Sequence, residues 1–182
     1  MSGGLSGITK EFQQLESRKK EIMEILHALP QELYIRNPNP GTWSPAQVAT
    51  HLYMSEKLSL AYLKKKLTYP DSVPKYHPRS WLGIGLIRLV YLTGYKVKAP
   101  EKIDMWKIQE VLSLEELNEK WTGLRKEMFL FIESKFPAFG THLTFRHPFA
   151  GRMTFYQMLL FFNAHVHNHQ KQLKRILKQL HA

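Results

Sequence analysis

The sequence predicts an all-α four-helix bundle with a long middle crossover that contains a short extra helix. Four long stretches repeat apolar residues at three- and four-residue spacing, and none sustains the period-two alternation of a half-buried strand. With 182 residues, 43% of them hydrophobic, the chain can bury one sizeable core, so we expect residues 1–182 to form a single domain. Four amphipathic helices pack most simply as a bundle, whose interior can host a metal ion or a ligand.

The first two long helices have recognisable limits. Across residues 9–29 the apolar positions form one stripe, which is typical of an amphipathic helix. Residues 37–41 contain two prolines and cannot continue that helix. Ser44 is then expected to cap a second helix, with a proline at its first position and Gln47 completing a capping box. This helix should run to about Leu67.

The middle of the chain should form the crossover. Residues 68–79 contain three prolines, which predict an irregular segment. Residues 81–92 are mostly apolar and predict a short buried or interfacial helix. Two glycines inside that stretch, Gly83 and Gly85, argue against the helix because glycine is a poor helix former.

The last two long helices also carry capping signals. Ser113 opens a capping-box pattern that is followed by apolar residues with the spacing of a bundle seam, and we expect Pro137 to stop this helix. Residues 147–151 are expected to form a loop. Thr154 with Gln157 repeats the capping signature, and the helix that follows should run nearly to the C-terminus.

Composition excludes several kinds of chemistry and location. The chain has no cysteine, so it has no disulfide, no thiolate nucleophile and no cysteine-ligated cluster of its own. The longest mostly apolar run is shorter than the roughly 20 residues of a membrane-spanning helix, so we expect no transmembrane segment. Residues 1–7 do not resemble a secretory signal, and we therefore expect a cytoplasmic protein.

The formal charge of +11 is unevenly distributed along the chain. Residues 57–98 hold nine lysines and arginines against one acid, and residues 134–182 hold seven and no acid. This asymmetry favours an anionic small molecule, an acidic membrane surface or nucleic acid as the partner; solvated basic helix faces are the alternative. No motif that reads nucleic acid is present, so nucleic acid is the least favoured of these partners.

Three histidines are candidates for a metal site. His165 and His169 are four residues apart on the last predicted helix, so they project from one face and can bind the same ion. His167 is turned about 200° from that face and is expected to be a solvent or packing residue. His51 lies on the core-facing stripe of the second helix and is the best third ligand. The alternative is that these imidazoles are simply hydrogen-bonded or exposed.

The segments around these histidines resemble the two metal motifs of the DinB-like superfamily. Residues 41–52 match the first motif, in which a Trp-Ser helix start, here Trp43 and Ser44, precedes a histidine. Residues 147–173 match the second, with a His-Pro loop, a helix opening and a His-x-x-x-His-x-x-Gln pattern. The two motifs occur in the expected order, and the segment between them matches by architecture only.

The resemblance implies a four-helix bundle that binds a divalent metal through His51, His165 and His169 and is often a homodimer. Imidazole suits Zn²⁺, Ni²⁺, Fe²⁺ and Mn²⁺, so the sequence does not single out the ion. Gln172 and Asn163 are candidates to orient the ligand imidazoles by hydrogen bonds, with a surface role as the alternative.

Characterised members of the superfamily include metal-dependent thiol transferases and proteins described as hydrolases. The resemblance therefore implies an enzyme that activates a low-molecular-weight thiol, in an S-transferase, or water, in a hydrolase. The basic stretches favour an anionic thiol as the small-molecule substrate. No catalytic residue is assigned, because Glu56 should face about 140° away from His51. The competing hypothesis is a non-enzymatic basic binding module, or a scaffold whose metal is structural or vestigial.

Overall fold

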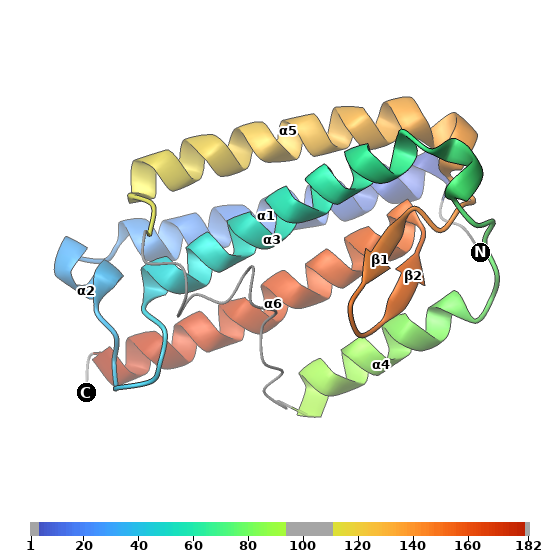
Figure 1. Ribbon diagram of the computed structural model, residues 1–182. Coiled ribbons are helices and arrows are strands. Elements are labelled where there is room, and N and C mark those ends of the chain that lie inside the picture. Colours follow the sequence, from blue (N-terminus) through green and yellow to red (C-terminus); the bar gives the residue numbers. More distant parts are fainter. Residues whose placement is uncertain (1–3, 94–110, 181–182) are drawn as a thin grey trace.

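A computed structural model describes residues 4–93 and 111–180, and it confirms the all-α fold (Figure 1). The four long helices are α1 (Leu5–His27), α3 (Pro45–Leu67), α5 (Leu114–Phe139) and α6 (Phe155–Leu180). Helix α1 packs against α5 and α6, and α3 packs against the same two helices. The four helices therefore surround one core, with α1 diagonally opposite α3.

Shorter elements lie at the ends and along one side of this bundle. They are α2 (Gln31–Ile35), the 3₁₀ turn η1 (Pro70–Ser72), α4 (Ser80–Thr93), β1 (Phe145–His147) and β2 (Gly151–Met153). Helix α4 confirms the extra helix expected in the crossover, and it packs against α6 and β2. The rest of the crossover, residues 94–110, lies outside the described residues.

The predicted caps define where the helices that carry the site begin. The backbone N–H of Gln47 donates to the Ser44 hydroxyl at 3.2 Å, and the Ser44 N–H donates to the Gln47 side chain at 2.9 Å. Thr154 and Gln157 form the same reciprocal pair at the start of α6. Each cap satisfies N–H groups that the first helical turn leaves without partners. These caps fix the first residues of α3 and α6 and therefore the angular position of every later side chain.

The core is one continuous cluster of apolar side chains contributed by all four long helices. Trp121, Phe155 and Phe162 are among its largest fully buried members. Within the described residues, no helix is both long and apolar enough to span a membrane.

One expectation about chain breaks was wrong, and another holds in part. Helix α5 continues through Pro137 to Phe139, because a proline in the last turn forfeits only one backbone hydrogen bond. Residues 148–150 form the expected loop, whereas His147 and Gly151 end the strands of a hairpin in which Phe145 pairs with Met153. Gly151 permits the tight turn because its φ of 76° lies in the left-handed region.

Gly83 is required where the hairpin turn meets α4. A Cβ atom at Gly83 would lie 1.9 Å from the backbone oxygen of Ala150, whereas a Cβ atom at Gly85 would have no neighbour within 4 Å. The glycine that weakened the helix prediction is therefore present for close backbone packing.

We expect Gly83→Ala to lower the free energy of unfolding by about 1–3 kcal/mol, because α4 and the hairpin must move apart. The matched change Gly85→Ala should be neutral or stabilising by up to about 1 kcal/mol, because alanine is the better helix former. Denaturant unfolding followed by circular dichroism measures both values. Equal values for the two variants would contradict the close contact at Gly83.

Candidate metal centre

The structure brings three imidazoles from two helices together inside the bundle. His51 projects from the second turn of α3, and His165 and His169 project from neighbouring turns of α6. The Nε2 atom of His165 lies 3.4 Å from Nε2 of His51 and 3.1 Å from Nε2 of His169. Each of the three residues offers a ligand atom, and these atoms all lie within 4.8 Å of one another. All three side chains are buried.

These separations suit a single metal ion. Imidazole nitrogens bind Zn²⁺ at about 2.0–2.1 Å, and two such ligands at a tetrahedral angle lie about 3.3 Å apart. The distances of 3.1 and 3.4 Å are close to that value. Three nitrogen donors also suit Ni²⁺, Fe²⁺ and Mn²⁺, so this set of residues fits the divalent ion that the sequence motifs imply.

Gln172 sets the proton position on one imidazole. Its Oε1 atom lies 2.8 Å from Nδ1 of His169. A carboxamide oxygen only accepts hydrogen bonds, so Nδ1 must carry the proton. The lone pair of His169 is then on Nε2, the atom that faces the other two histidines.

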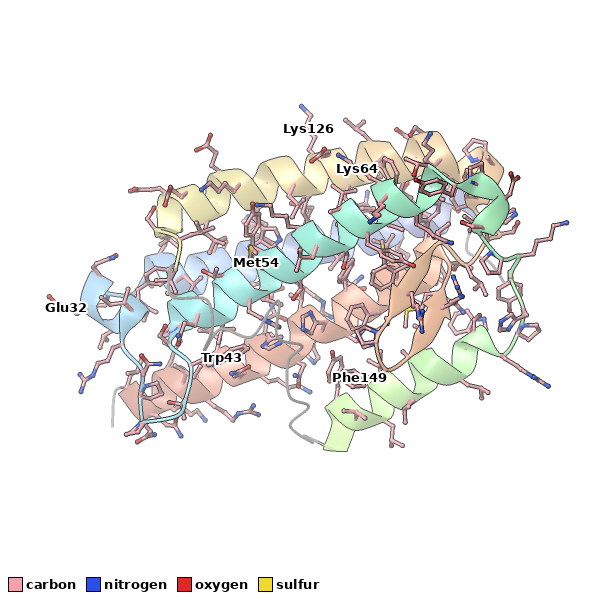
Figure 2. The ribbon with its side chains drawn as sticks, in the orientation of Figure 1. Glu32, Trp43, Met54, Lys64, Lys126 and Phe149 are labelled. Carbon is pink, nitrogen blue, oxygen red and sulfur yellow. The ribbon has the colours of Figure 1, made fainter. Side chains whose placement is uncertain are left out.

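Aromatic side chains pack against the histidines. The Trp43 ring is stacked with His169 at a centroid distance of 6.3 Å and lies 5.0 Å from His51. Phe161 is stacked with His165 at 5.4 Å. Figure 2 shows Trp43 beside α6, close to the start of α3. These rings hold the imidazoles in place and shield them from water.

Burial keeps His165 and His169 neutral. Burial, with smaller contributions from the neighbouring histidines, places the pKa of His165 well below its ordinary value of 6.5. Burial, together with the charges of His51 and Arg175, lowers the pKa of His169 to about 3. Metal binding requires the neutral imidazole, and at neutral pH both residues are in that form without a metal.

The His-Pro loop contacts the site through one aromatic ring. The ring of His147 lies 4.6 Å from Phe161, the residue stacked on His165. Its Nδ1 atom accepts hydrogen bonds from the backbone N–H groups of Phe149 and Ala150. Burial lowers the pKa of His147 to about 4, so it is also neutral. His147 therefore shapes the hairpin turn that supports the site.

The expectation that Asn163 orients a histidine of the cluster needs correction. Its amide donates to the backbone oxygen and to the carboxylate of Glu11, so it joins α6 to α1. The reason is angular, because a residue two positions before His165 is turned about 200° round the helix. His167 lies on the same side of α6 as Asn163; it is exposed and pairs with Arg18, in agreement with the sequence.

Sequence reasoning missed three contributors to this environment. Trp43 packs directly on His169, and Phe161 and Tyr91 pack on His165, with the Tyr91 ring at a centroid distance of 6.3 Å. Phe161 precedes His165 by four residues, so the helical spacing held a signal for its position. Trp43 lies outside any helix, and its contact with His169 depends on how α3 meets α6.

The fold and the site together define a class: an all-α bundle with a buried three-histidine cluster between two of its helices. The comparison with protein families agrees with this class, because the model of the DinB superfamily matches residues 14–173. The chain belongs to the DinB superfamily. No match was found among curated proteins or among solved structures.

Proposed function

We propose that the protein binds one divalent metal ion through His51, His165 and His169 and uses it as an enzyme. The observation that supports this proposal most strongly is the convergence of three imidazoles, with His165 Nε2 at 3.1 and 3.4 Å from the Nε2 atoms of His169 and His51. Three protein ligands leave at least one coordination position for a substrate, which is the arrangement of catalytic sites. Membership of the DinB superfamily is compatible with this proposal.

A metal ion in this position would lower the pKa of a bound thiol or water. The surrounding residues favour the thiol. The positive charge of Arg175 acts on His169, and α6 carries further lysines at 171, 174 and 178 without an acid. This charge would attract an anionic low-molecular-weight thiol. We therefore propose an S-transferase-type enzyme, acting in the cytoplasm as a homodimer, with water activation as the second candidate.

The roles of the surrounding side chains follow from their contacts. Gln172 holds His169 in the tautomer whose lone pair faces the site. Trp43 and Phe161 cover the imidazole faces and restrict the entry of water. A dry surrounding strengthens the attraction between the ion and a thiolate.

A conjugation assay tests the proposal. Metal-loaded protein should accelerate the reaction of cysteine or glutathione with monochlorobimane, in which a sulfur–carbon bond forms and chloride leaves. His169→Ala should abolish the acceleration, and His167→Ala, which changes an exposed histidine of the same helix, should retain it. Equal rates for wild type and His169→Ala would refute a role for the site in thiol transfer. Ester hydrolysis that depends on His169, without conjugation, would identify water as the activated group.

A further inference from the structure

Helix α4 exposes a stripe of leucines. Leu82, Leu86 and Leu89 are 73%, 52% and 57% exposed. Their spacing of four and three residues places them on one side of the helix. Ile84 and Ile87 are buried on the other side, where α4 packs against α6 and β2. Helix α4 therefore has a second apolar face that the fold of this chain leaves exposed, which is typical of an interaction site.

The hairpin turn adds a fourth exposed apolar side chain next to this helix. Phe149 is 59% exposed, and the neighbouring Ala150 touches α4 at Gly83. Figure 2 shows Phe149 at the tip of the hairpin, beside α4. We call Leu82, Leu86, Leu89 and Phe149 the α4 surface.

Basic side chains without acidic partners flank the α4 surface. Lys75 and Arg79 are exposed just before α4. Arg146 and Arg152 lie directly opposite each other in the hairpin, on the side away from the buried pair of Phe145 and Met153. Within residues 4–93 and 111–180, none of these four cations forms a salt bridge.

This charge pattern points to an anionic partner. Two like charges directly opposite each other in a hairpin destabilise it, and an anion placed near both would relieve the repulsion. A second copy of the chain is a poorer fit, because a twofold interface would bring this positively charged patch against the same positively charged patch of the partner. Exposed leucines flanked by lysine and arginine are instead the pattern of helices that lie in the surface of an anionic bilayer.

We propose that the α4 surface binds the face of an anionic lipid bilayer. The leucines and Phe149 reach the boundary between headgroups and acyl chains, and Lys75, Arg79 and the paired arginines interact with lipid phosphates. The helix lies in the interface and does not span the membrane. The leucines lie on the side of α4 opposite Tyr91, whose ring is stacked with His165 at 6.3 Å, and the proposal does not depend on the metal-dependent activity.

Vesicle sedimentation tests the proposal. The full chain should sediment with vesicles made of equal parts phosphatidylglycerol and phosphatidylcholine, and it should stay in the supernatant with phosphatidylcholine alone. Leu86→Glu should weaken binding by about tenfold or more, because it places a carboxylate at the lipid surface. The matched control is Leu130→Glu on α5, since Leu130 is also 52% exposed, and it should bind as wild type does. Leu82→Glu provides a second variant at a more exposed position.

Several results would overturn the proposal. Failure of the wild-type chain to bind anionic vesicles would do so, as would equal binding by Leu86→Glu, Leu82→Glu and wild type. A dimer that Leu86→Glu dissociates in sedimentation velocity, without vesicle binding, would show that a second copy covers the surface. Removal of both hairpin arginines, Arg146→Ala with Arg152→Ala, should weaken binding and its dependence on salt. An unchanged salt dependence would refute the role given to these arginines.

Discussion

Protein carrying His165→Ala should contain almost no divalent metal when it is purified, whereas the wild type should contain about one ion per chain. His165 is the central residue of the histidine cluster, since its Nε2 lies 3.4 Å from that of His51 and 3.1 Å from that of His169. Substitution of a residue that hydrogen-bonds to a metal ligand lowers metal affinity by about 10–100-fold. Loss of a ligand itself should therefore lower metal affinity by more than about 100-fold. His167→Ala should retain the metal, because His167 is exposed on another face of the same helix.

Elemental analysis of protein purified without a polyhistidine tag measures this difference. The triple variant of His51, His165 and His169 gives the baseline for adventitious metal. Gln172→Ala should fall between the wild type and His165→Ala, because it removes the partner of His169 Nδ1 and leaves all three ligands. Equal metal content in the wild type and the triple variant would show that the cluster is a set of packed histidines.

Acid stability of the metal-free chain provides a second readout of the same side chains. The pKa of His169 is about 3 in the folded chain, and burial also lowers the pKa of His165, whereas a histidine in an unfolded chain titrates near 6.5. Below pH 6.5 the unfolded state therefore binds more protons, and the free energy of unfolding decreases until the pH reaches about 3. For His169 alone the slope approaches about 1.4 kcal/mol per pH unit. Denaturant unfolding across this range should show a shallower slope for His169→Ala than for His167→Ala.

The sequence predicts the long helices and the convergence of the histidines for related physical reasons. Ser44 and Thr154 mark the first residue of a helix, and the 3.6-residue period then determines which later side chains share a face. The i, i+4 spacing of His165 and His169 needs no knowledge of the tertiary structure. The position of His51 was predicted only because the face on which it lies is apolar and must be buried.

Other features depend on contacts between distant segments and could not be predicted in this way. The hairpin strands are three residues long, too short for an alternating pattern to be detected. Gly83 is unfavourable for a helix considered alone, and its use becomes clear only where Ala150 approaches. Trp43 lies in a connection, so its stacking on His169 follows from how α3 packs on α6.

Glu56 has a structural role that its sequence position did not reveal. It faces away from the histidines, as predicted, and its carboxylate accepts hydrogen bonds from Trp121 Nε1 at 2.9 Å and from Arg125 Nε and Nη2 at 2.8 and 2.7 Å. Arg125 also pairs with Glu16 at 3.1 Å. The buried network therefore joins α3, α5 and α1 on the side of α3 opposite the site. It restrains the rotation of α3, which sets the direction of His51.

We expect Arg125→Met to lower the free energy of unfolding by about 3–5 kcal/mol. Glu56 and the Arg125 side chain are both almost completely buried, so the change would leave a buried carboxylate without its cation. The matched surface change is Lys64→Met, which removes the cation from the exposed pair of Lys64 and Glu127. That variant should lose no more than about 1 kcal/mol, because water screens exposed pairs. Urea denaturation of the two variants gives both values.

A double-mutant cycle separates the ion pair from simple loss of packing. Arg125→Met with Glu56→Gln should recover part of the stability that Arg125→Met alone loses, because the glutamine carries no charge and can still accept a hydrogen bond from Trp121. If the two changes are instead additive, the cost of Arg125→Met comes from packing of its aliphatic portion. Metal content of the double variant then tests the link to the site. Restored stability with reduced metal binding would show that the network, through the rotation of α3, positions His51.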